Sequence, residues 1–391
     1  MDRSNDYPWL DLIDRRVTIG VFPPLIPGIV AETLQKKRQE GMAHKQKIKE
    51  IVNKEQKVEC LRFLHEVSTE DGSALKMTQK TPLDRKPVAS VILVHGLGQN
   101  RYSWSLSRRS MENYLVAKGF ETYNVELRGH GLSRSDSGNY PERFQTYLKY
   151  DLPAFLQAIQ KTSNPSQLFY MGHSLGGTIA YCLEARFQKK ISGIISIGGP
   201  FHMAKGNFLL KNIARAGVAV EKLAPFHLPY PKAFYVDYIG ALARPGLFLM
   251  DSPLYKIPLQ IWYPGSIERD ILKERITKGF DRTGMNVVRF MFKWGAEGKL
   301  RGLFGDTDYE KQIRRLQVPI LFLVGDKDHA VPLASVQAAY DQAGSRDKTL
   351  KIFNKQSTSA HWGHIDMICG RNAPLYVWPY MLKWLRKRLA A

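Results

Sequence analysis

The stretch Gly-His-Ser-Leu-Gly at residues 172–176 decides how this chain of 391 residues is expected to fold. It follows the apolar run Leu-Phe-Tyr-Met and leads into a helix-like segment at residues 177–185, an order that predicts a strand, a sharp turn and a helix. A turn this tight forces Ser174 into a strained backbone conformation, and side chains at Gly172 or Gly176 would collide with the neighbouring strand and helix. The Ser174 hydroxyl is then exposed at the N-terminus of a helix, where developing negative charge is stabilised.

A serine in this position is a nucleophile only if the chain also supplies a base, an orienting acid and an oxyanion hole. The next buried-strand pattern, residues 318–324, ends just before two acids, Asp326 and Asp328. An acid on the loop that leaves a parallel strand lies at the sheet edge where such sites assemble. We select Asp328, because a glycine three residues before the acid and a proline after it are the usual arrangement; Asp326 is the alternative.

The base is expected near the C-terminus of the chain. Residues 350–353 have the pattern of a last strand, and two histidines, His361 and His364, follow it. We select His364, which comes after a glycine and before a helix-like segment, with His361 as the runner-up.

The oxyanion hole is expected upstream of the serine. An apolar strand at residues 91–94 runs into His95-Gly96-Leu97-Gly98, whose glycines allow the loop to approach the reacting carbonyl. The backbone N–H groups of Leu97 and Leu175 are the predicted donors, each stabilising the transition state by roughly 3 kcal/mol. We interpret His95 and His173 as structural neighbours of the site.

These elements, all placed after predicted strands and in the required order, predict the α/β-hydrolase fold: a mostly parallel, doubly wound sheet with an inserted cap. Residues 1–58 are expected to form a basic N-terminal extension. Residues 59–199 and 306–391 are expected to form the core, which begins with a hairpin at residues 59–80. Residues 200–305 break the strand–helix rhythm and are rich in proline and aromatic side chains, so they are the predicted cap.

Several segments resemble the acid lipase family, which includes the gastric and lysosomal lipases. They are Tyr-Asp-Leu-Pro-Ala at residues 150–154, the serine and oxyanion segments, and His-Ile-Asp-Met-Ile-Cys-Gly at residues 364–370 with Ala-Pro at residues 373–374. By position, the resemblance implies Ser174 as nucleophile, Asp328 as acid, His364 as base, and Leu97 and Leu175 as oxyanion donors. It also implies hydrolysis of lipid esters.

The charge of the chain suggests a partner surface. The formal net charge is +21, and basic residues gather at residues 35–57, which we expect to be helical, and at residues 383–388. In a lipase-like chain this pattern favours contact with anionic lipid, where each surface Lys or Arg adds about 1 kcal/mol. No nucleic-acid-binding motif accompanies the charge, so no nucleic-acid partner is predicted. Residues 17–30 are apolar but short and interrupted by prolines, and we expect them to form a strap on the protein or on a membrane surface.

Three scattered cysteines, Cys60, Cys182 and Cys369, give no disulfide framework and no metal-ligand spacing. We therefore predict no metal and no organic cofactor. The N-terminus also lacks a signal-peptide pattern, which favours a cytoplasmic protein that associates with membranes.

The predicted chemistry is two-step acyl transfer through an acyl-serine, with hydrolysis of a lipid ester as its outcome. Three alternatives use the same sequence features. They are a thioesterase or acyltransferase with the same triad, carbon–carbon hydrolysis or perhydrolysis on the same fold, and a catalytically inert interaction protein on membranes.

Overall fold

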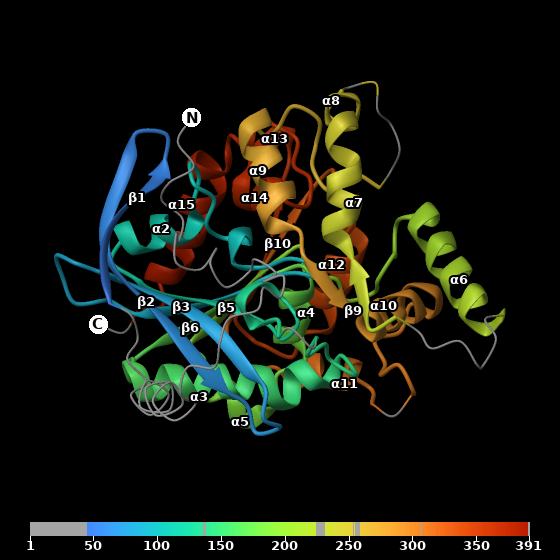
Figure 1. The fold of residues 1–391 in the computed structure, drawn as a ribbon, viewed down its shortest axis with the longest axis horizontal. Helices are drawn as coiled ribbons and strands as arrows, with labels where there is room; N and C mark the ends of the chain where they lie inside the picture. Colours follow the sequence, from blue (N-terminus) through green and yellow to red (C-terminus); the bar gives the residue numbers. More distant parts are fainter. Residues whose placement is uncertain are drawn as a thin grey trace, which may run out of the picture. The chain divides into compact units, whose positions relative to one another are not determined.

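A computed structural model describes residues 45–135, 138–223, 231–252, 254, 259–305 and 307–389. These residues contain a nine-stranded sheet in the order β1-β2-β3-β5-β4-β6-β7-β10-β11 (Figure 1). The pairs β1–β2, β2–β3 and β3–β5 are antiparallel, and the sheet is parallel from β5 through to β11. The strands are β1 (Gln46–Asn53), β2 (Gln56–Ser68), β3 (Ala74–Pro82), β4 (Ser90–Val94), β5 (Glu121–Glu126), β6 (Leu168–His173), β7 (Gly193–Ile197), β10 (Ile320–Gly325) and β11 (Lys348–Phe353).

Both faces of the parallel strands are buried. In β4, Ile92 and Val94 belong to one hydrophobic cluster, whereas Val91 and Leu93 belong to a second cluster on the opposite face. This alternation follows from the period-two geometry of a strand, and burial on both faces explains why the strands read as continuous apolar runs. The predicted doubly wound α/β-hydrolase sheet is confirmed.

Helices cover the two faces of this sheet. The first cluster includes side chains of α3, α4 and α12, and the second includes side chains of α2, α14 and α15. The helices of these layers are α2 (Met111–Ala117), α3 (Leu152–Thr162), α4 (Leu175–Tyr181), α5 (Ala185–Gln188), α12 (Leu333–Gln342), α13 (Lys355–Thr358), α14 (Asp366–Cys369) and α15 (Ala373–Arg386).

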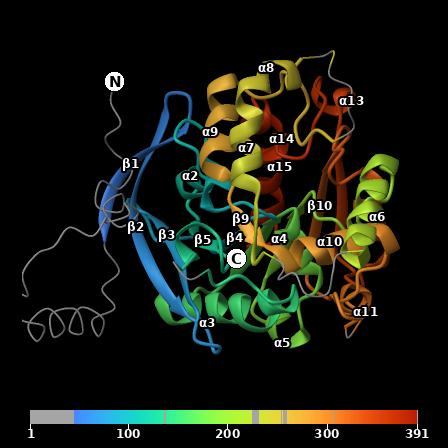
Figure 2. The ribbon, with the colours of Figure 1, turned by 45° about the vertical axis from the view of Figure 1, so that its right-hand side comes forward.

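The segment between β7 and β10 departs from the strand–helix alternation, as expected for an insertion. In Figure 2, α6 and α10 lie on the side away from β1, whereas α7, α8 and α9 stand above the middle of the molecule. The elements are α6 (Phe208–Leu223), β8 (Ala233–Tyr235), α7 (Val236–Ala243), α8 (Leu247–Met250), α9 (Arg269–Gly279), β9 (Arg282–Gly284), α10 (Met285–Glu297) and α11 (Glu310–Arg314). A third hydrophobic cluster packs Trp262 and Ile276 of this segment against Ile365, so the segment contacts the loop that carries His364.

The start of the sheet corrects one prediction. Residues 46–57 are not helical: they form β1 and the beginning of β2, which pair as an antiparallel hairpin. In β1 the more buried Ile48, Glu50 and Val52 alternate with the exposed Lys47 and Lys49. This period of two is that of a strand, and on a helix it would not place the apolar residues on one face.

Strand β1 is also held by charge. Glu50 lies 2.5 Å from the buried ammonium of Lys80 on β3, and this ion pair fixes the register of β1 on its inner face. The predicted domain limit at residue 58 therefore falls inside β2, whereas residues 35–44 and the strap at residues 17–30 lie outside the described part of the chain. The hairpin predicted at residues 59–80 is confirmed as β2–β3, turning at Gly72 with φ of 81°.

Candidate active site

Ser174 occupies the turn between β6 and α4, with a left-handed φ of 53° and ψ of −119°. A Cβ added to Gly172 would lie 2.4 Å from the carbonyl carbon of Gly176, and one added to Gly176 would lie 2.4 Å from the carbonyl oxygen of Val94. The predicted need for both glycines is confirmed, because backbone atoms fill the space on each side of the turn. The Ser174 amide donates to the Ile197 carbonyl at the end of β7, and the side chain is partly exposed.

His364 and Asp328 form a buried pair beyond the ends of β11 and β10. Nδ1 of His364 lies 2.8 Å from Oδ2 of Asp328, and both side chains are almost completely buried. The other carboxylate oxygen of Asp328 accepts a hydrogen bond from the Val331 amide at 2.7 Å. Because a carboxylate accepts only, the proton of the neutral imidazole lies on Nδ1, which leaves the Nε2 lone pair of His364 free to act as a base.

The two alternative residues form a second pair. Nδ1 of His361 lies 2.5 Å from Oδ2 of Asp326, whose other oxygen accepts from the Trp362 amide. This pair is more exposed, and the His361 ring packs against Tyr263 at a centroid distance of 5.0 Å.

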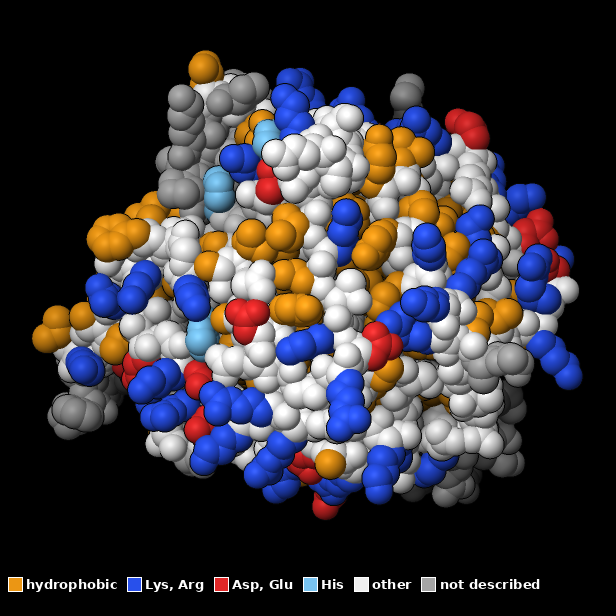
Figure 3. Space-filling view, turned by 180° about the vertical axis from the view of Figure 1, so that it is seen from behind, with side chains coloured by type: hydrophobic (Ala, Val, Ile, Leu, Met, Phe, Trp, Pro, Cys, Tyr) orange, Lys and Arg blue, Asp and Glu red, His pale blue; other side chains and the backbone are white. Residues whose placement is uncertain are grey.

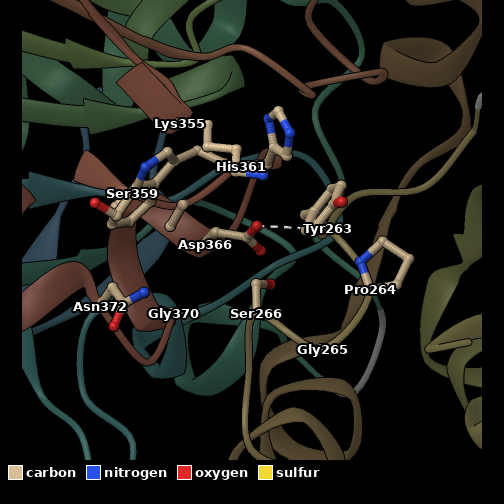
Figure 4. A pocket seen from close by; sticks show the side chains of 12 residues that line it. Tyr263, Pro264, Gly265, Ser266, Lys355, Ser359, His361, Asp366, Gly370 and Asn372 are labelled. Atoms are coloured by element: carbon tan, nitrogen blue, oxygen red, sulfur yellow. Dashed lines mark hydrogen bonds between the residues drawn. The ribbon is translucent and has the colours of Figure 1, made fainter. Parts of the chain in front are cut away.

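His361 lines a pocket of about 270 Å³, which Figure 4 shows from close by. The pocket wall includes Tyr263, Ser266, Lys355 and Asp366. Neither Ser174 nor the loop at residues 95–100 belongs to it.

The Ser174 turn adjoins the first pair. The ring of His173 lies 4.5 Å from the ring of His364, and its Nε2 is 3.3 Å from the His364 carbonyl oxygen. Gly198, which follows the Ile197 acceptor, has a φ of 55°, and a Cβ there would lie 2.9 Å from Nδ1 of His364 and 3.2 Å from Asp328. Ser174 after β6, Asp328 after β10 and His364 after β11 thus lie at one edge of the sheet, around the end of β7.

The loop after β4 approaches Ser174 from the other side. A Cβ on Gly96 would lie 2.9 Å from the Cβ of Ser174, so only glycine allows this close approach. Within the described residues, the amides of Leu97 and Leu175 donate to no protein acceptor. An N–H group without another acceptor is available to stabilise an oxyanion, and these two amides are therefore the candidates.

Comparisons with known proteins show which families the chain is similar to. A model described as the alpha/beta hydrolase fold matches residues 89–216, and a model described as serine aminopeptidase, S33, matches residues 303–357. Lipase member K of Mus musculus is 36% identical over 132 residues, which are 30% of this chain and 33% of that protein. Gastric triacylglycerol lipase of Rattus norvegicus is 23% identical over 82% of this chain and 87% of its own length.

The chain has the α/β-hydrolase fold and resembles the acid lipase family. Human lysosomal acid lipase/cholesteryl ester hydrolase is 31% identical over 34% of this chain and 37% of its own length. The alignments with lipase K and lysosomal acid lipase thus span only about a third of those relatives. Among solved structures, the soluble variant of monoglyceride lipase from Saccharomyces cerevisiae has a TM-score of 0.57 at 17% identity, over 83% of this chain and 95% of that one, a likeness of fold.

The Tyr-Asp-Leu-Pro-Ala segment at residues 150–154 has a structural role. Asp151 is fully buried and accepts from the Arg128 amide at 3.0 Å and from its guanidinium at 2.7 Å. Arg128 also pairs with Asp71 in the β2–β3 turn. Burial raises the pKa of Asp151 to about 6 even though Arg128 favours the charged form. The loop at residues 128–131 therefore has a structural role.

Asp366 belongs to the site, although sequence reasoning assigned it no role. It is buried, and its Oδ2 accepts from the amides of Gly363 at 2.6 Å and Tyr263 at 2.9 Å, the latter drawn as a dashed line in Figure 4. Burial raises the pKa of this carboxyl to about 7, against the effect of the two amide donors. Asp366 thereby ties the loop before His364 to the segment between β7 and β10. Its place two residues after His364 was the available signal.

Sequence reasoning also assigned no role to Gln99, which lies in the loop at residues 95–100, or to Arg275, which donates to it. Arg275 belongs to α9, and no pattern in the sequence connects it to residue 99. His95 and His173 have the scaffold surroundings expected of them: both are buried, and burial lowers the pKa of each well below its usual range.

Proposed function

We propose that this hydrolase cleaves carboxylic esters of lipid-like substrates through an acyl-enzyme on Ser174. The observation that carries the proposal is the strained Ser174 turn, flanked by two unengaged amides and adjoining the buried His364–Asp328 pair. No cofactor or metal enters the proposed steps.

In the proposed reaction, Nε2 of His364 takes the Ser174 proton while the serine oxygen attacks the ester carbonyl. The N–H groups of Leu97 and Leu175 hold the negatively charged oxygen of the tetrahedral intermediate. His364 then gives its proton to the departing alcohol, and water repeats the sequence to release the acid. Asp328 keeps the imidazole in the required orientation and stabilises its charged form.

The surroundings of the two histidines support His364 as the base. The His364 ring packs on His173, the residue before the serine, whereas the His361 ring packs on Tyr263 and lines a pocket without Ser174. Gly198 also brings the end of β7, whose Ile197 binds the Ser174 amide, against the His364 ring.

The proposed cap, residues 200–305, supports a lipid-like substrate. Its helices expose large apolar side chains, and exposed apolar patches of this kind mark contact surfaces. Side chains more than half exposed include Phe208, Val220 and Leu223 of α6, Tyr238, Ile239 and Leu242 of α7, and Leu249 of α8. The relatives named above act on triacylglycerol and cholesteryl esters according to their names, and we extend ester hydrolysis to this chain as part of the proposal.

Contact with anionic lipid belongs to the same proposal. Lys and Arg side chains are spread widely over the face seen in Figure 3, with fewer acidic ones among them. At the C-terminal end Arg388 is engaged by Asp347, so Lys383, Arg386 and Lys387 carry this part of the proposal. No helix among the described residues is both long and apolar enough to span a bilayer. A cytoplasmic location stays a prediction, which fractionation of cells would check.

The test is hydrolysis of p-nitrophenyl esters of increasing acyl length, with and without anionic vesicles. We expect the wild type to prefer long acyl chains, anionic vesicles to raise its rate, and Ser174→Ala to remove the activity. Ser359→Ala, which changes an exposed serine near His361, is the matched control and should retain it.

Activity that survives Ser174→Ala would overturn the proposed nucleophile. A wild type that hydrolyses thioesters but not oxygen esters would replace the proposed substrate class. Equal rates with neutral and anionic vesicles would remove the proposed anionic surface while leaving the chemistry intact.

A further inference from the structure

Among the residues that the structure describes, one buried arginine has no carboxylate partner. Arg275 on α9 has no exposed surface, and within the described residues it forms no ion pair. Its Nε and Nη1 have no hydrogen-bond partner, and its Nη2 donates to Oε1 of Gln99 at 2.9 Å. Burying a charged group with one hydrogen-bond acceptor costs folding free energy. The contact with Gln99 is therefore the place where a role of the guanidinium is expected.

The partner, Gln99, lies in the loop that supplies the proposed Leu97 donor. Its Oε1 also accepts from the Ser103 hydroxyl at 2.9 Å and lies 3.2 Å from Nδ1 of His173. A guanidinium donates and never accepts, so the amide atom that faces Arg275 is the oxygen. Arg275 therefore fixes the orientation of the Gln99 amide, and that amide contacts the residue before Ser174.

Backbone contacts around Arg275 hold the same loop. The Asp281 amide donates to the Gly98 carbonyl at 2.8 Å, and Gln99 forms an isolated β-bridge with Phe280. The Asn100 side chain donates to the Lys278 carbonyl at 2.9 Å. Lys278, Phe280 and Asp281 thus each contact one residue of the oxyanion loop.

The space for the guanidinium is specific. A Cβ on Gly279 would lie 2.8 Å from Nη1 of Arg275, so glycine at this position accommodates the arginine head. On the loop side, a Cβ on Gly96 would lie 3.2 Å from Oε1 of Gln99 and 2.9 Å from the Cβ of Ser174. Gly96 thus packs against both Ser174 and Gln99, and Gln99 contacts Arg275.

We propose that Arg275 is a positioning residue of the oxyanion hole: through Gln99 it holds the loop at the distance from Ser174 that the Leu97 N–H requires. The inference rests on the proposed ester hydrolysis. Arg275 touches neither substrate nor the reacting atoms, and its effect falls on the transition state rather than on substrate binding.

The test compares Arg275→Met, which has no donor, with Arg275→Lys, which keeps a charged donor. The matched control is Arg269→Met, which removes an exposed arginine from the same helix. We expect Arg275→Met to lower kcat about tenfold to a hundredfold with KM within about twofold, Arg275→Lys to recover part of the loss, and Arg269→Met to behave as the wild type.

A second measurement does not depend on turnover. An alkyl boronic acid forms a tetrahedral adduct with an active serine and places an oxygen in the oxyanion hole. We expect Arg275→Met to weaken its binding by the same factor as it lowers kcat, with thermal unfolding followed in parallel. Gln99→Met should give a similar loss, and the double variant should lose little more than either single one, because both act through one contact.

The inference fails if Arg275→Met keeps kcat within about twofold, or if its losses add fully to those of Gln99→Met. If Arg275→Met does not fold, Gln99→Met alone decides by the split between kcat and KM. A wild type that neither hydrolyses esters nor binds the boronic acid overturns the proposed function itself. A wild type that does both, and is matched by Arg275→Met, overturns only the role of Arg275.

Discussion

The molecule contains two histidine–carboxylate pairs that are almost equivalent along the chain. His361 and Asp326 are 35 residues apart, and His364 and Asp328 are 36 residues apart. Each pair joins Nδ1 to an aspartate oxygen, and in each the second carboxylate oxygen accepts a backbone amide. Their surroundings differ: His361 lines a pocket and its pair with Asp326 is partly exposed, whereas the pair of His364 and Asp328 is buried against the end of β7 and the Ser174 turn.

The difference teaches that a histidine–aspartate hydrogen bond by itself does not identify a general base. An imidazole held by a carboxylate serves catalysis only where its second nitrogen reaches a nucleophile. In this chain the neighbourhood of Ser174, and not the hydrogen bond to a carboxylate, distinguishes the two histidines. Substitutions made in parallel at both pairs test that distinction directly.

The largest contrast is expected at the histidines. His364→Ala should lower kcat for ester hydrolysis by at least about a thousandfold, because the serine loses its proton acceptor. His361→Ala should keep kcat within a few-fold, since its ring contacts Tyr263 and a pocket wall. Initial rates with a p-nitrophenyl ester measure both. Equal losses at the two positions would contradict the assignment of the base.

The two aspartates should differ in the same direction as the two histidines, with a smaller loss of kcat. Asp328→Asn should reduce kcat by about a hundredfold to ten-thousandfold, because an amide facing Nδ1 favours the wrong tautomer of His364. Asp326→Asn changes the corresponding contact of His361 and should leave kcat nearly unchanged. The measurement is kcat across neutral pH for both variants. A larger loss from Asp326→Asn would exchange the roles of the two acids.

Two glycines with left-handed backbones offer a subtler comparison. Gly198→Ala adds a methyl group 2.9 Å from Nδ1 of His364, whereas Gly265→Ala, beside the His361 pocket, adds one to open space. Both alanines incur a similar backbone strain of about 1–2 kcal/mol. We therefore expect similar losses of thermal stability, but a fall in kcat of about tenfold only for Gly198→Ala, because it displaces the base. Unfolding temperature and kcat measured together check this, and equal kcat values for the two variants would refute it.

The sequence predicted the parts of this site that local geometry determines. Ser174 between Gly172 and Gly176, after an apolar run, requires a strained turn, and the same reasoning gave the sheet and the glycine loop before Leu97. The choice between the two aspartates and the two histidines rested on weaker signals, because the two pairs have nearly the same spacing along the chain. Only the packing of His173 and Gly198 on His364 separates them.

Contacts between distant elements lay beyond sequence reasoning. Arg275 and Gln99 are 176 residues apart, and nothing in either neighbourhood indicates the other. The prediction of a helix over β1 was wrong because the strand's alternation includes a charged residue, Glu50, on its more buried face. Glu50 is stable there because it forms an ion pair with Lys80 on β3. In both cases a polar residue owes its position to a partner from another part of the fold.

A comparison of stability, with no expected change in mechanism, concerns Asp366, which lies in the wall of the His361 pocket and accepts from the Gly363 and Tyr263 amides. Its pKa is raised by burial from 3.8 to about 7, so the folded state binds a proton that the unfolded state releases at lower pH. The stabilisation is complete below about pH 4 and is lost as pH rises towards 7.

Asp366→Asn removes this titration, so the two proteins should differ in the slope of stability against pH. From about pH 5 to about pH 8 the wild type should lose roughly 2–3 kcal/mol of unfolding free energy relative to the variant. Urea unfolding at several pH values measures the difference, and all other titrating groups cancel in it. Parallel curves for the two proteins would show that Asp366 stays charged, and that the two amides outweigh its burial in holding the His364 loop.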